Sequence, residues 1–239
     1  MAILNSYKIA ALFTIGIFVA GCTSNVTTSA QYSGFISDYS KLQEAESASG
    51  QKVLRWVSPD FNAKKYTGVY YTPLVYYPSS APTHRVNQKT LDEMLAYANK
   101  RLKEAVSHQL PLVNSPKRRN TLIVRAAITA VSAEDKNLEV YEMIPIAAVI
   151  AGTMAASGNR AQQAALYLEV QVIDSNTGKP VIVVVRKAYG KEVSNSGEPI
   201  TADEVKSTID GLVYDIINFK AKSQPTSYNT YYRSASVNN

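Results

Sequence analysis

The position of the single cysteine most constrains what this chain can fold into. Cys22 follows the apolar run Ile9–Ala20 after one glycine, Gly21, and that run follows Lys8, the one charged residue of the leader. One positive charge, about a dozen apolar residues and a small-residue exit are typical of a cleaved signal peptide, and the run is too short to remain as a membrane span. Because disulfides need pairs of cysteines, the exported domain has to be held together by its hydrophobic core alone.

The residues around this cysteine predict a lipid anchor. Val19, Ala20 and Gly21 resemble the lipobox of lipoprotein signal peptidase, which cleaves before a cysteine whose thiol carries diacylglycerol. A plain signal peptide or an uncleaved anchor is the alternative. Acyl chains such as palmitate on Cys22 would anchor the protein stably, since each buried methylene contributes about 0.8 kcal/mol. By the same resemblance, Thr23 in place of an aspartate favours the outer membrane, with the domain facing the periplasm.

Composition along the chain predicts a single folded domain between two less ordered ends. We expect a removed signal peptide (1–21), a lipid-anchored tether and N-terminal arm (22–52), one periplasmic domain (53–221) and a disordered tail (222–239). Within the arm, Thr23–Ala30 is expected to be flexible, the aromatic Tyr32–Leu42 to lie against the domain, and Glu44–Gln51 to form a loop.

Hydrophobic periodicity predicts an α+β fold. Helices are expected from a capping box at Thr90–Glu93 to about His108, and from a second capping box at Thr201–Glu204, with a buried stripe that ends at Ile216 and Ile217. Strands are expected at Lys65–Tyr77, Asn120–Ser132, Ala165–Asp174 and Val181–Ala188, with a further short strand possible at Leu54–Ser58. The expected architecture is a two-layer sandwich of a mixed, mostly antiparallel four-stranded sheet with two amphipathic helices, plus an apolar insert.

The apolar insert, residues 143–158, is the most unusual stretch of the chain. It has no charge and many small residues. One interpretation is a buried helix or loop packed on the sheet. The other is an exposed surface that contacts a membrane or a partner, for which the candidate residues are Met143, Ile144, Ile146, Val149, Ile150 and Met154.

Motifs that carry catalysis are missing from the sequence. It contains no GxSxG, HExxH, P-loop, CxxC or glycine-rich dinucleotide motif, so we expect no enzyme and assign no catalytic residue, metal site or cofactor. His84 and His108 are too few for a convincing metal site or triad. The net charge of +6 is not concentrated in one basic run, which argues against nucleic acid as a partner; Lys117–Arg119 is expected to be solvated.

Several of these segments together resemble a known family. The run Ser33–Leu42, the extended segment with Pro73 and Val75, Pro145–Ile146 with the apolar insert, and Ala165–Asp174 with Thr177–Gly178 resemble bacterial lipoproteins of domain of unknown function 3313. The resemblance implies an exported lipoprotein and supplies no catalytic residues.

The leading hypothesis is therefore a non-enzymatic outer-membrane lipoprotein that binds or scaffolds another cell-envelope protein, with its oligomeric state left open. The alternative is a lipid- or glycan-binding module that uses the apolar insert and a tyrosine-rich strand, whose members are Tyr66, Tyr70, Tyr71, Tyr76 and Tyr77.

Overall fold

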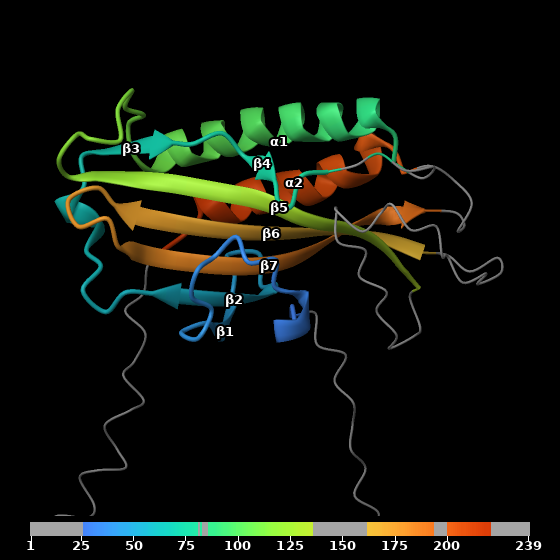
Figure 1. Ribbon diagram of the computed structural model, residues 1–239, viewed down its shortest axis with the longest axis horizontal. Coiled ribbons are helices and arrows are strands. Elements are labelled where there is room, and N and C mark those ends of the chain that lie inside the picture. The colour runs from blue at the N-terminus through green and yellow to red at the C-terminus, as the bar shows by residue number, and fades with distance from the viewer. Residues whose placement is uncertain (1–25, 81, 83–85, 136–161, 194–199, 221–239) are drawn as a thin grey trace, which may run out of the picture.

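One mixed sheet of seven strands forms the centre of the domain, with two helices on one face and the N-terminal arm on the other (Figure 1). The computed structural model describes residues 26–80, 82, 86–135, 162–193 and 200–220. The strand order is β1–β2–β7–β6–β5–β3, and β4 also pairs with β5. The α+β class is as predicted, but the sheet is larger than the four strands expected.

The bounds of the elements follow. The strands are β1 (Gln43–Glu46), β2 (Lys52–Val57), β3 (Gly68–Tyr71), β4 (Val75–Tyr76), β5 (Thr121–Asp135), β6 (Gln162–Asp174) and β7 (Pro180–Val193). The helices are α1 (Gln88–Gln109) and α2 (Ala202–Ile217), and short 3-10 helices lie at Ser29–Gln31 and Ala63–Lys65. Strands β5, β6 and β7 are antiparallel neighbours, whereas β3 and β4 run parallel to β5. Among the described residues, no helix combines the length and apolarity that crossing a membrane needs.

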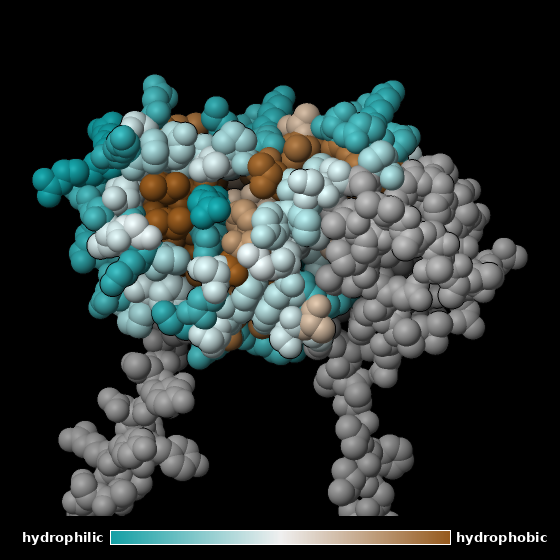
Figure 2. All heavy atoms as spheres, viewed as in Figure 1, coloured by the Kyte–Doolittle hydropathy of each residue, from teal (hydrophilic) through white to brown (hydrophobic). Residues whose placement is uncertain are grey.

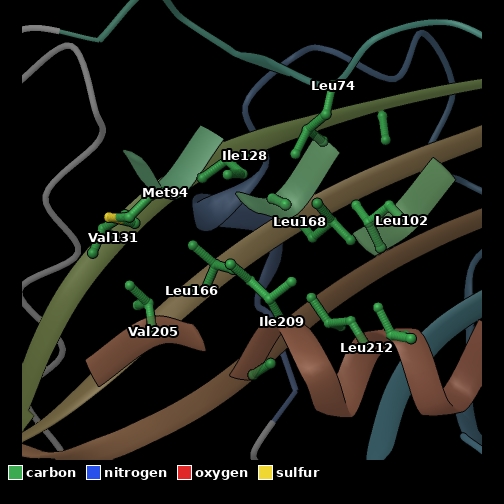
Figure 3. Packing of buried hydrophobic residues seen from close by; sticks show 14 of the residues in the cluster. Leu74, Met94, Leu102, Ile128, Val131, Leu166, Leu168, Val205, Ile209 and Leu212 are labelled. Atoms are coloured by element: carbon green, nitrogen blue, oxygen red, sulfur yellow. The ribbon is translucent and has the colours of Figure 1, made fainter. Parts of the chain in front are cut away.

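The main core lies between the helices and the central strands (Figure 3). Leu102 of α1 and Leu212 of α2 meet Leu168 of β6 there, each at most 4% exposed. The predicted helical stripes are confirmed, except that Leu95 and Ile216 are half-buried and Ile217 is 39% exposed. Helical periodicity therefore identifies the buried face correctly until the last turn of α2, where the sheet is no longer covered closely.

One predicted strand and one predicted loop are wrong for local reasons. The expected strand Lys65–Tyr77 is divided into β3 and β4, because Pro73 has no N–H to donate to the ladder; both pieces pair with β5 at the sheet edge. The expected loop Glu44–Gln51 overlaps β1 (Gln43–Glu46), which pairs with β2 through a turn at Gly50 (φ +77°).

A bulge in β5 changes which residues face the helices. The alternation of apolar residues predicts Ile128 and Ala130 on the same side. The register with β6 shifts between these two residues, so Ala130 joins Tyr167 on the outer face and Val131 joins the helix-facing core. One extra residue in a strand reverses the facing of everything after it.

The two helix starts differ in how well the sequence predicts them. The capping box at Thr201–Glu204 is confirmed, since Glu204 Oε2 accepts from Thr201 N at 2.5 Å. The capping box at Thr90–Glu93 is wrong: α1 begins at Gln88, and Asn87 Oδ1 accepts from Thr90 N at 2.9 Å. Asparagine is at least as good an N-cap as threonine and lies earlier in the chain.

The N-terminal arm is packed on the outer face of the sheet. Val26 and Thr27 are buried, so the prediction of a flexible segment is wrong from Val26 onward, whereas the prediction that Tyr32–Leu42 lies against the domain is confirmed. The buried carboxylate of Glu169 on β6 accepts from Ser33 N (2.9 Å) and from the Tyr39 hydroxyl (2.7 Å). Burial and this hydrogen bond raise the pKa of Tyr39 to about 12.

Candidate functional site: an apolar cavity beside two arginines

A cavity of about 280 Å³ lies between the helix-facing side of the sheet and the C-terminal ends of both helices. It is at the end of the sheet where β5 begins and β6 ends (left in Figure 1). Its walls are formed mainly by aliphatic side chains of five strands: Val53, Val69, Leu122, Val124, Leu168, Val170, Val172, Ile182 and Val184. The last turns of α1 and α2 contribute Val106, Leu110, Leu212 and Ile216, and Phe61 and Phe219 complete the apolar lining.

The cavity exists because the helices are shorter than the strands. The 14 residues of β7 extend over ~48 Å, whereas the 16 residues of α2 cover ~24 Å. α2 begins beside Gly190, where a Cβ would meet Glu204 O at 2.5 Å, and nears its end at Asp215, which pairs with Arg186. The first residues of β7 therefore extend past the C-terminal end of α2.

The ends of the two helices are joined at the rim of the cavity. Gln109 of α1 donates from Nε2 to the carbonyl oxygens of Ile216 and Ile217, at 2.7 Å each. These carbonyls are among the last four of α2, which have no partner inside the helix. Gln109 therefore caps two of the last carbonyls of α2 and links the C-terminal ends of the two helices.

Three lining residues are charged: Arg55, Arg186 and Asp215. Arg186 Nη1 donates to Asp215 Oδ2, and both residues are more than nine-tenths buried. Asp215 also accepts from Ser49, at 2.6 Å from the backbone N and 3.1 Å from Oγ. This pair therefore fastens the β1–β2 turn to α2 and leaves Asp215 fully engaged.

Arg55 has no such counterion. It lies on β2 opposite Val184, and so faces the same side of the sheet as Arg186. Among the described residues it makes no ion pair with a carboxylate; its guanidinium carbon lies 5.5 Å from the centre of the Phe219 ring. Burial lowers its pKa from the usual value. The Nε atoms of both arginines are buried without a hydrogen-bond partner.

The charged residues that line the cavity thus carry two positive charges and one negative, a net charge of +1. Such a wall can accept an anionic group next to apolar surface. Among the described residues, no three His, Cys, Asp or Glu side chains are grouped as a metal site.

The tyrosine-rich strand does not form one flat binding face. The hydroxyls of Tyr71 and Tyr76 donate to Asn99 Oδ1 (3.2 Å) and to Leu91 O (2.8 Å), both on α1. Tyr66 is 8% exposed, and burial together with the Asp174 carboxylate raises its pKa to about 12. Tyr77 is 39% exposed and contacts Phe35 edge-on.

The described surface offers few large apolar areas. In the view of Figure 2 it is mostly hydrophilic, and hydrophobic residues reach it in small areas. The large hydrophobic side chains that are exposed among the described residues are Val75, Tyr77, Leu112, Tyr214 and Ile217. The cavity, in contrast, brings many apolar side chains together around one space.

Other predicted site residues lie outside the described residues. These are Val19, Ala20, Gly21 and Cys22 of the predicted anchor, His84, and the candidate contact residues Met143, Ile144, Ile146, Val149, Ile150 and Met154.

Conversely, sequence reasoning missed Arg55, Arg186 and Asp215. A signal was present for two of them: Arg186 occupies an inward position of the alternation Ile182, Val184, Ala188, and Asp215 lies on the apolar face of α2.

Comparison with known proteins shows the family to which this chain belongs. The family model "Protein of unknown function (DUF3313)" matches residues 31–216, and the chain belongs to this family, as its motifs predicted. It is a lipoprotein similar to "Uncharacterized lipoprotein YdcL" of Escherichia coli strain K12, at 42% identity over 212 residues, 89% of this chain and 95% of the relative. The Escherichia coli O157:H7 protein of the same description matches equally well.

Two solved structures are similar at low identity. The PelC dodecamer from Paraburkholderia phytofirmans matches with a TM-score of 0.33 and 9% identity, over 69% of this chain and 97% of that one. The hypothetical protein CT253 from Chlamydia trachomatis matches with a TM-score of 0.34 and 14% identity, over 64% and 94%.

Proposed function

We propose that this lipoprotein is anchored in the outer membrane and that its periplasmic domain binds an acyl chain in the apolar cavity, without changing it chemically. The observation that carries the proposal is a cavity of about 280 Å³ whose lining is almost entirely apolar. This volume is just below the ~300–1,000 Å³ typical of small-molecule sites, and it suits one chain better than two.

The exposed apolar walls of the cavity support a binding role. The cavity is partly open, so its aliphatic side chains contact water when no ligand is bound. An acyl chain that covers these walls is favoured by roughly 25 cal/mol for each Å² of apolar surface that it removes from water.

The same lining favours a lipid over a glycan and binding over catalysis. Sugar rings need many hydrogen-bonding partners, whereas the uncharged polar lining residues are Ser47 and Gln109. Asp215, the one carboxylate of the lining, is engaged by Arg186 and Ser49 and so is poorly placed to act as a general base. An envelope-protein partner stays a prediction, since the apolar segment 143–158 that partly suggested one lies outside the described residues.

A cavity-blocking substitution tests acyl binding. We expect acyl lipid to co-purify with the wild-type protein, detected by native mass spectrometry, and to be reduced about tenfold or more in Val184→Phe, whose ring would occupy the cavity. The matched control is Val75→Phe on β4, since Val75 is 45% exposed and does not line the cavity. Equal lipid in Val184→Phe and in the wild type, both folded by circular dichroism, would contradict the proposal. Recovery of a chemically altered ligand would contradict its non-enzymatic part.

A second experiment tests the anchor. Radiolabelled palmitate should be incorporated into the wild-type chain and not into Cys22→Ser, and the labelled protein should sediment with outer membranes on a density gradient. Label retained by Cys22→Ser would reject the lipidation site, and label in the inner-membrane fraction would reject the location.

A further inference from the structure

We propose that the cavity selects a free fatty acid, whose carboxylate is bound by Arg55 while its chain occupies the apolar lining. The inference rests on the proposed function and adds the chemical class of the head group. It starts from the difference between the two arginines of the cavity, because one of them has a counterion and the other does not.

Arg186 is already neutralised. Its Nη1 donates to Asp215, and that carboxylate is held in turn by Ser49. Arg186 retains one donor without a partner, its Nε, which is buried in a side chain that is only 8% exposed. A buried donor left unsatisfied is costly unless a ligand supplies the acceptor.

Arg55 supplies the positive charge with which a ligand carboxylate would pair. Its Nε is also buried without a partner, and no carboxylate among the described residues pairs with it. Since Arg55 and Arg186 lie on neighbouring strands and face the same side of the sheet, both unused donors belong to one wall of the cavity. A planar carboxylate can accept two hydrogen bonds from a guanidinium, which makes it the natural partner of Arg55.

The net charge of +1 on the lining favours a monoanion. A phosphate monoester carries about −1.5 to −2 charges at neutral pH and would leave negative charge uncompensated in an apolar space. A neutral head group would leave Arg55 unpaired, and an ammonium group would meet a like charge. A fatty acid therefore matches the cavity in charge, in acceptor geometry and in its single chain.

The test compares ligands that share one chain and differ in the head group. Dodecanoate, 1-dodecanol and dodecylamine are titrated below their aggregation concentrations at pH 7.5 into the full mature chain carrying Cys22→Ser, which has no acyl group of its own at that position. Affinities are measured by isothermal titration calorimetry. Dodecanoate should bind about tenfold more tightly than 1-dodecanol, the factor expected from charge-assisted hydrogen bonds, and dodecylamine more weakly than either.

Substitutions assign this preference to Arg55. Arg55→Met should weaken dodecanoate binding about tenfold and leave 1-dodecanol binding unchanged, and Arg55→Gln is the second variant if the methionine variant does not fold. Arg55→Lys should retain part of the preference, because it keeps the charge and loses the planar fork. Arg125→Met is the matched control, since Arg125 lies against Phe35 of the arm, on the outer face of the sheet.

The outcomes separate this inference from the function on which it rests. Equal affinities for dodecanoate and 1-dodecanol would overturn the inference and leave acyl binding intact. Binding of none of the three ligands would overturn the proposed function itself. If Arg55→Met keeps the full preference for dodecanoate, or if Arg125→Met loses that preference, then Arg55 does not determine which head group is bound.

Discussion

Replacing Asp215 by alanine removes the counterion of a buried arginine. The side chains of Arg186 and Asp215 are 8% and 9% exposed, and in the Asp215→Ala variant the Arg186 guanidinium would stay in that environment without its carboxylate. The same change deletes both hydrogen bonds by which Ser49 holds the β1–β2 turn to α2. The variant thus disturbs the wall of the cavity and its rim together.

The expected loss of stability is large. Removing one partner of a buried ion pair typically costs about 3–5 kcal/mol, because the remaining charge stays desolvated. The lost contacts of Ser49, which lies at the surface, add little beyond this range. We therefore expect a loss of about 4 kcal/mol, which corresponds to a decrease in Tm of roughly 8–16 °C for a domain of this size.

Asp210→Ala on the same helix is the matched control. Asp210 accepts from Arg101 Nε (3.0 Å) and from the Tyr97 hydroxyl (2.8 Å), but the side chains of Arg101 and Asp210 are 35% and 45% exposed. An ion pair this accessible to water contributes at most about 1 kcal/mol. The two aspartates thus differ mainly in the burial of their partner.

Equilibrium unfolding in urea at pH 7.5, followed by the fluorescence of Trp56 and by circular dichroism, gives the two free-energy changes. The paired replacement Arg186→Met with Asp215→Leu should recover most of the stability lost in Asp215→Ala, because no charge is then left buried. The reasoning is refuted if Asp215→Ala loses no more than Asp210→Ala, or if the paired replacement is as unstable as the single one.

Three further predictions concern the arm, the tyrosines and the glycines. Glu169→Gln should destabilise the protein by about 1.5–3 kcal/mol and raise amide exchange in the arm, measured by hydrogen–deuterium exchange, because Tyr39 loses the carboxylate to which it donates. The pKa of Tyr71 is about 12, raised mainly by burial, so the unfolded state loses this proton first and stability should fall between pH 10 and 12. Urea unfolding across that range should show a shallower fall in Tyr71→Phe, and an equal fall would exclude this tyrosine. Gly190→Ala should cost about 1–3 kcal/mol, because its Cβ would lie 2.5 Å from a backbone carbonyl of α2. Gly211→Ala, with nothing within 4 Å, should instead stabilise α2 by about 0.5–1 kcal/mol, and thermal unfolding that ranks the two variants the other way would contradict both.

Periodicity was enough to predict the elements whose burial is regular. The stripes of α1 and α2, and the alternation along β6 and β7, identify their faces because each element has one fixed repeat. Prediction failed where a single residue interrupts that repeat: Pro73 divides one strand, and the bulge before Ala130 reverses the facing of another. It also failed for β1, whose polar sequence Gln-Glu-Ala-Glu forms a strand because of the hairpin with β2 and not because of its composition.

The cavity could not be predicted from any one segment. It results from the difference in length between α2 and β7, and from the partial cover that the β1–β2 turn and Phe219 provide, so it depends on contacts far apart in the sequence. The buried pair of Arg186 and Asp215 is different, since each charge stands at an apolar position of a clear pattern. Arg55 offered no such signal, because β2 is short and its alternation is incomplete.

Strand β6 contacts the N-terminal arm on one face of the sheet and lines the cavity on the other. On β6, Glu169 holds the arm on the outer face while its neighbours Leu168 and Val170 line the cavity on the inner one. Val26, the first buried residue of the arm, is four residues after Cys22, and four residues span at most ~14 Å. With Cys22 acylated as proposed, the arm therefore holds the domain close to the membrane and not on a long tether. Because the arm lies on one face of the sheet and the cavity on the other, the arm and the proposed binding site do not compete for the same surface.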